Sequence, residues 1–272
     1  MKELLFCLIL LLVSAPDMAQ SADMWETKLP FKEATISYQI TGTQTGSSTV
    51  FLKDYGKTSA IYRNATTKIM GITNQENTLS ILTPDWIYNI DLNSKEGTKQ
   101  INPEKYFIEE FNNLSAAERQ KVAANAENMS MGTMVGMDGQ VEKNAAKILG
   151  YSCDKVTMMG ITIYSISDTD LSLKTETNMM GMAFTEVATK INKGSVPAAK
   201  FAIPADIQIT HQPAADEMAK SHAKMTIQSL LEGKRPSDRM EQYNTPNNQQ
   251  QDMPSDMKEQ MEKMMKMFGG QG

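Results

Sequence analysis

The sequence predicts a mainly β protein in which antiparallel strands are interrupted by an α-helical insert and followed by C-terminal helices. Two patterns predict this class. Apolar and polar residues alternate in segments that recur about every ten residues, with turn-forming residues between them. The apolar period then changes from two to 3.6 after residue 101 and again after residue 212, which indicates helices at both places.

Residues 1–22 are expected to be a cleavable secretory signal peptide. A short apolar stretch over residues 4–13 follows Lys2, and it is too short to span a bilayer of roughly 30 Å. Small residues at Ala19, Ser21 and Ala22 offer cleavage positions. The pattern places the protein in the periplasm or outside the cell.

The first predicted strand covers residues 34–41, where Ile36, Tyr38 and Ile40 share one side and polar residues occupy the other. The same reading predicts further strands over residues 49–53, 59–63, 68–73, 78–83, 86–92, 146–148, 153–158, 162–167, 171–176 and 184–191. Such a succession is typical of an antiparallel meander.

Capping residues predict the helices. Asn102 before Pro103 and the box Ser115–Glu118 open an insert over about residues 102–128. A third helix is expected from Pro213 to a stop at Gly233. Residues 233–253 are polar, with Pro236, Pro246 and three consecutive glutamines, which predicts a disordered linker. Residues 254–272 are expected to form a methionine-rich amphipathic helix.

Composition excludes several function classes. The net charge of −5 argues against nucleic-acid binding, which needs clustered Lys and Arg. Removal of the signal would leave Cys153 as the sole cysteine, so no intramolecular disulfide is expected, and we predict a buried thiol on a strand. Neither histidine lies in a catalytic motif. We therefore expect a protein that is not an enzyme and needs no cofactor.

A resemblance rests on the order of these parts and on two motifs: the Gly-Tyr-x-Cys turn at residues 150–153 and the closing Phe-x-Ile-Pro at residues 201–204. Over about residues 30–210 the chain resembles a family of exported bacterial proteins that is distantly similar to periplasmic lipoprotein carriers of the LolA and LppX type. The resemblance implies that residues 23–232 form a LolA-like domain. Its sheet would be a strongly curved, unclosed half-barrel, with helices covering an apolar concave face that holds acyl chains.

The expected function is therefore an exported carrier of a lipid or another apolar ligand. The candidate ligand-binding residues on the concave face are Ile36, Tyr38, Trp86, Tyr88 and Met158. Aromatic side chains can line an apolar cavity, although core packing is the alternative for the strand of Trp86 and Tyr88.

Two other functions stay open. The chain holds 22 methionines, and a cluster at Met129, Met131, Met134 and Met137 could bind Cu(I) in a copper-binding envelope protein, because thioethers are soft ligands. Flexible core filling also explains methionine. The third candidate is an envelope interaction protein without cargo, whose methionine-rich tail contacts an envelope protein.

Overall fold

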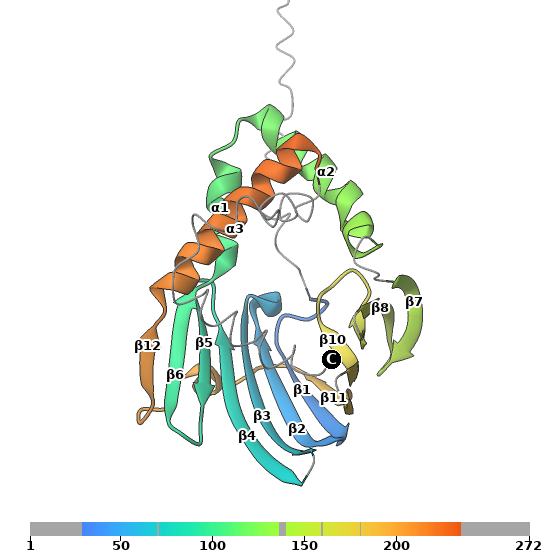
Figure 1. Cartoon of the computed structure of the whole chain (residues 1–272), viewed down its shortest axis with the longest axis vertical. Coiled ribbons are helices and arrows are strands. Elements are labelled where there is room, and N and C mark those ends of the chain that lie inside the picture. The colour runs from blue at the N-terminus through green and yellow to red at the C-terminus, as the bar shows by residue number, and fades with distance from the viewer. Residues whose placement is uncertain (1–28, 70, 136–139, 159, 180, 235–272) are drawn as a thin grey trace, which may run out of the picture.

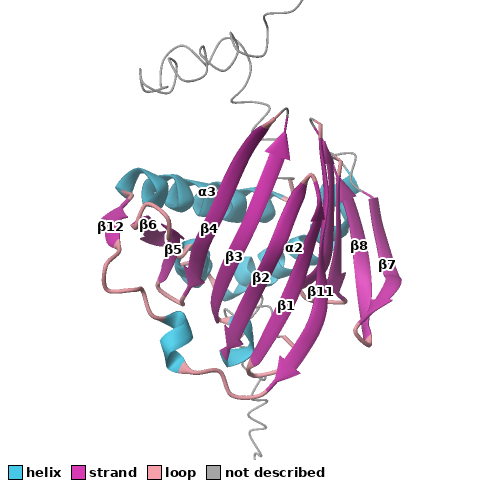
Figure 2. Cartoon of the chain, turned by 90° about the horizontal axis from the view of Figure 1, so that it is seen from below, coloured by secondary structure: helices cyan, strands magenta, loops and turns pink. Residues whose placement is uncertain are grey.

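The computed structural model describes residues 29–69, 71–135, 140–158, 160–179 and 181–234. The predicted signal peptide, the predicted linker beyond residue 234 and the methionine-rich tail lie outside these residues. Within them the protein is mainly β, with one large curved sheet that does not close and three α-helices (Figures 1 and 2). The predicted fold class is confirmed.

Two antiparallel meanders make up the sheet. The first contains β1 (Ala34–Gly42), β2 (Gln44–Lys53), β3 (Thr58–Ile69), β4 (Ile72–Leu82), β5 (Trp86–Asp91) and β6 (Glu96–Ile101). The second contains β7 (Gln140–Ile148), β8 (Tyr151–Met158), β9 (Ile161–Ile166), β10 (Ser172–Met179) and β11 (Met182–Lys193). Pairing of β1 with β11 joins them. The short β12 (Gln208–His211) adds in parallel to β6, so the strand order is β12-β6-β5-β4-β3-β2-β1-β11-β10-β9-β8-β7.

Several strand predictions need correction. The predicted strand over residues 68–73 instead crosses the hairpin turn between β3 and β4, where Ile69 pairs with Ile72. β6 was not predicted, because its sequence Glu-Gly-Thr-Lys-Gln-Ile carries no apolar alternation. β7 starts at Gln140, six residues before the predicted strand, for the same reason. Hydrogen bonding to a neighbouring strand extends these segments where their own side chains give no signal.

The helices begin where the sequence predicts, and α3 also ends there. Asn102 Oδ1 accepts a hydrogen bond from the Glu104 N–H at 3.1 Å at the start of α1 (Pro103–Asn112). Before α2 (Ala116–Val135), the Glu118 carboxylate accepts from the Ser115 N–H at 2.9 Å. Gly233 ends α3 (Pro213–Glu232) with a φ of 70°, the left-handed conformation that glycine adopts at low cost. α2 continues to Val135, beyond the expected end of the insert near residue 128.

The helices form a layer over the open side of the curved sheet (Figure 1). This helix layer has an apolar core of its own, built on Phe111, Val122, Ile227 and Leu230. The sheet has two more apolar clusters, one including Ile36, Tyr38 and Leu52 and the other including Leu79, Ile81 and Ile90. In the described parts of the chain, no helix is both long and apolar enough to cross a bilayer.

Candidate ligand-binding cavity

A cavity of about 560 Å³ lies on the face of the sheet that the helix layer covers. Its apolar wall consists of Leu29, Val50, Leu52, Ile61, Leu82 and Leu171. Val50 and Ile61 are cross-strand partners on β2 and β3, so their side chains share one face. Ile61 is 38% exposed although it lies in mid-strand, because it borders this space rather than packed protein.

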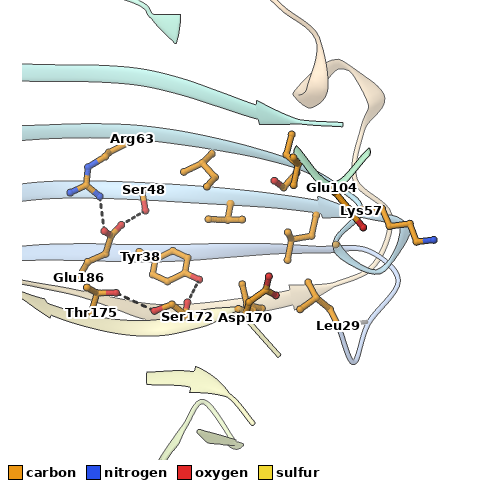
Figure 3. Close-up of a pocket in the computed structure, with 17 residues that line it drawn as sticks. Leu29, Tyr38, Ser48, Lys57, Arg63, Glu104, Asp170, Ser172, Thr175 and Glu186 are labelled. Atoms are coloured by element: carbon orange, nitrogen blue, oxygen red, sulfur yellow. Dashed lines mark hydrogen bonds and ion pairs between the residues drawn. The ribbon is translucent and has the colours of Figure 1, made fainter. Parts of the chain in front are cut away.

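A polar network built around Arg63 lies at one end of the cavity (Figure 3). Arg63 donates from one terminal nitrogen to Glu186 at 2.6 Å and from the other to Gln44 Oε1 at 2.6 Å. Its Nε lies 3.5 Å from Glu76. Ser48 donates to the second oxygen of Glu186 at 2.5 Å. The network joins β2, β3, β4 and β11. Ser48, Arg63 and Glu186 line the cavity, whereas Gln44 and Glu76 contact Arg63 without lining it.

Tyr38 extends from β1 along the floor of the cavity, and its hydroxyl donates to the Ser172 carbonyl oxygen at 2.8 Å. Burial raises the pKa of the Tyr38 hydroxyl, and the nearby Glu186 carboxylate raises it further. Tyr38 is therefore a neutral hydrogen-bond donor whose ring adds apolar surface to the cavity.

The opposite end of the cavity is bounded by Leu29, Lys57 and Glu104, as Figure 3 shows. A 3₁₀ turn over Asp54–Gly56 shapes this end, and Gly56 has a φ of 100°. A Cβ atom on Gly56 would lie 2.9 Å from the Leu29 side chain, so glycine permits both the turn and the contact. Glu104 comes from the first turn of α1, so the helix layer contributes to the cavity.

The structure brings together only some of the predicted ligand-binding residues. Tyr38 lines the cavity, and Ile36 lies on the same face of β1 but is fully buried beneath it. Met158 ends β8 opposite Ile161 and does not line the cavity.

Trp86 and Tyr88 require a correction, because they lie on the opposite face of the sheet. Residues that pair directly across antiparallel strands point to the same face of the sheet. Tyr88 pairs with Ile81, Ile81 with Ala60 and Ala60 with Phe51, so these side chains share one face. Val50 and Ile61, which line the cavity, precede or follow Phe51 and Ala60 by one residue and point to the other face. Trp86 packs edge-on against His211 at a ring distance of 5.4 Å. Tyr88 packs in the outer cluster with Phe201 and Ile203. Alternation within β5 could show that the two aromatics share a face but not which face it is.

The proposed copper ligands do not fall among the described side chains. Met129, Met131 and Met134 lie on α2, where only the backbone is described, and Met137 lies outside the described residues. Within the described part, no group of three or more His, Cys, Asp or Glu side chains could hold a metal ion.

Cys153 is a fully buried thiol on β8, as predicted. Burial raises the pKa of the thiol, and the adjacent Asp154 carboxylate adds to this effect, so the nucleophilic thiolate is disfavoured. The thiol packs in the cluster that contains Tyr38 and Leu52.

Arg63, Glu186 and Ser48 were not predicted as site residues. Arg63 and Glu186 are separated by 123 residues and meet only because β11 pairs with β1. Arg63 could have been predicted from the sequence, because it lies two residues after Ile61 and therefore shares its face of the strand. A charged residue at such an apolar-facing position indicates a polar site.

No family model matches the chain, and no curated protein matches it. One similar solved structure is a conserved protein from Thermus thermophilus, described as uncharacterized, with 8% identity over 70% of this chain and 94% of the other, at a TM-score of 0.40. Another is PNGF-II, with 12% identity over 72% of this chain and 33% of the other, at a TM-score of 0.39.

Proposed function

We propose that this protein is an exported, non-enzymatic carrier that binds a lipid or another apolar ligand in the cavity under the helix layer. The observation that supports the proposal is an apolar-walled cavity of about 560 Å³ with a polar network at one end. Small-molecule sites have volumes of roughly 300–1,000 Å³ and combine apolar walls with a few fixed polar groups.

Ligand binding would draw its free energy from the apolar wall. Each methylene that leaves water for such a surface contributes about 0.8 kcal/mol. The polar network would hold a head group at one end while Val50, Leu52 and Ile61 contact the chain. Affinity is therefore expected to rise with chain length until the cavity is full.

The periplasmic or extracellular location is part of the same proposal. It is supported by the short apolar stretch near the start of the sequence and its small-residue cleavage positions. A carrier for apolar molecules is needed in such a compartment, because a lipid must cross water between two membranes or surfaces.

The Ile61→Trp variant tests the cavity directly. Ile61 is exposed toward the cavity, so a tryptophan there would occupy ligand space without replacing a packed core residue. We expect the affinity for a neutral apolar fluorophore, N-phenyl-1-naphthylamine, to fall by about tenfold or more. Titration followed by fluorescence enhancement measures it.

Ile72→Trp is the matched control, because Ile72 is 73% exposed at the turn between β3 and β4 and does not line the cavity. This variant should bind the fluorophore as the unmodified protein does. Equal affinity in the two variants would place binding elsewhere and contradict the proposal.

A further inference from the structure

Resting on the proposed carrier function, we propose that the cavity selects amphiphiles with an amine head group over those with a carboxylate head group. The inference concerns the polar network, whose charges are held in a fixed arrangement at one end of an apolar wall (Figure 3).

All three side-chain nitrogens of Arg63 already face protein acceptors. Its two terminal nitrogens donate to Glu186 and Gln44, each at 2.6 Å, and its Nε faces Glu76 at 3.5 Å. These contacts engage three of the five N–H donors of the guanidinium. Arginine often recognises a carboxylate through two parallel N–H groups, so a ligand carboxylate would compete with these acceptors, among them Glu186, which Ser48 also holds in place.

The charges of the network sum to −1, since the single positive charge of Arg63 stands against the two negative charges of Glu76 and Glu186. The Arg63 and Glu186 side chains are only 19% and 21% exposed, so solvent screens them less than surface charges. Burial is the main cause of the raised pKa of the Tyr38 hydroxyl, and the Glu186 carboxylate, which lines the same cavity, raises it further. The net negative charge of the network favours a cation.

The other end of the cavity does not reverse the preference. Lys57 is accompanied there by Glu104, and Asp170 also lines the cavity. Figure 3 shows the Lys57 amine directed away from the cavity. Acceptors, by contrast, surround the polar end: the Glu186 carboxylate and the hydroxyls of Ser48, Ser172 and Thr175 could receive the three N–H donors of an ammonium group.

The experiment compares dodecylamine with dodecanoate at pH 7 in competition with N-phenyl-1-naphthylamine on the full-length protein. Both ligands have the same chain length and are fully ionised at this pH. We expect dodecylamine to displace the fluorophore at a concentration about tenfold lower than dodecanoate.

The double variant Glu76→Gln/Glu186→Gln tests the cause. It removes both carboxylates, leaves Arg63 as the charge of the network and should invert the order, so that dodecanoate becomes the stronger competitor. Glu217→Gln is the control, because Glu217 is exposed on α3 and does not line the cavity. It should keep the amine preference.

The outcomes separate this inference from the carrier proposal. Equal competition by both ligands, or stronger competition by dodecanoate on the unmodified protein, would overturn the inference and leave the carrier function standing if Ile61→Trp still weakens fluorophore binding. No change of order in the double variant would also overturn it. Failure of every amphiphile and of the fluorophore to bind would overturn both.

Discussion

Asp154 on β8 holds an irregular part of β7 in place. The register between the two strands shifts between Glu142 and Ala146, and Asn144 there has a φ of 52°. The Asp154 carboxylate accepts hydrogen bonds from the Asn144 N–H at 2.9 Å, from Lys143 Nζ at 2.6 Å and from Ser167 Oγ at 2.7 Å. One carboxylate thus accepts the Asn144 N–H at the register shift and two side-chain donors beside it.

Stability should therefore fall in acid. Burial alone would raise the pKa of Asp154, but the hydrogen bonds from Asn144, Lys143 and Ser167 outweigh burial and lower the pKa from 3.8 to about 2. A carboxyl whose pKa is lower in the folded state stabilises the fold above pH 3.8, and this contribution is lost as the pH falls toward 2. The shift corresponds to at most about 2 kcal/mol.

Asp154→Asn should lower the free energy of unfolding by about this amount at pH 7 and remove part of the acid sensitivity between pH 4 and pH 2. Urea unfolding followed by circular dichroism measures both. Asp168→Asn is the control, since Asp168 contacts the same Lys143 at 3.3 Å but is 90% exposed. Equal losses in both variants would contradict the role of Asp154.

Individual residues were predictable where strand alternation alone decides their surroundings. Ile36, Tyr38 and Cys153 are buried as their positions predict. Trp86 and Tyr88 were assigned to the wrong face, because alternation does not say which face the helices cover. The answer depends on the segment that includes Phe201 and Ile203, which packs on the outer cluster.

At the scale of elements, one residue of α3 connects the helix layer to the sheet. Asp216 lies in the first turn of α3 and is buried. Its carboxylate accepts from the Ile101 N–H at 2.7 Å, at the end of β6, and its other oxygen lies 2.6 Å from His211 Nε2. The two contacts fix the start of α3 beside the start of α1.

Asp216→Ala should loosen this junction, because it leaves the Ile101 N–H without an acceptor. An unsatisfied buried donor costs about 1–3 kcal/mol. We expect faster hydrogen exchange at the Ile101 amide and over the first turn of α3, measured by nuclear magnetic resonance.

Glu217→Ala provides the comparison, since it removes the next acidic residue of the same turn, which is exposed. Exchange at Ile101 should be unchanged in this variant. Asp216→Asn retains a carbonyl oxygen and should preserve more protection than Asp216→Ala. Unaltered exchange in Asp216→Ala would show that the junction does not depend on this contact.

Helices and strands were predictable where the sequence carries helix caps or apolar alternation, and they were not predictable elsewhere. Asn102, Ser115 and Gly233 act as the sequence indicates, because caps involve neighbours in the chain. β6 and the first part of β7 are polar, and they are strands because β5 and β8 pair with them. Backbone pairing of this kind does not require apolar alternation in the added strand, so it leaves no pattern in that strand's sequence.

For the whole molecule, the main consequence of the fold is that the cavity lies between two separately packed bodies. Phe111 and Val122 belong to the core of the helix layer, whereas Val50 and Leu52, which line the cavity, belong to a separate cluster of the sheet. Hydrophobic clusters that do not merge can open at different free energies. The proposed carrier function would benefit from this arrangement if the helices moved while the sheet kept its shape.

Phe111→Ala should destabilise the helix layer locally. Phe111 is fully buried, and its truncation removes about 3–5 kcal/mol of packing. Because its cluster contains residues of the helices and their connection, we expect faster hydrogen exchange in α1, α2 and α3 and little change in β1, β2 and β3. Hydrogen exchange followed by mass spectrometry resolves the two regions. The dissociation rate of N-phenyl-1-naphthylamine should rise as well, since Glu104 of α1 borders the cavity.

Leu79→Ala is the matched control, because Leu79 is as fully buried as Phe111 but packs on the outer side of the sheet. It should speed exchange in β3, β4 and β5 and leave the helices and the fluorophore dissociation rate nearly unchanged. If Phe111→Ala instead accelerated exchange equally throughout the sheet, the helices and sheet would open as one unit. Ligand entry by movement of the helix layer would then require global unfolding, which a carrier that must release and reload its ligand could not use.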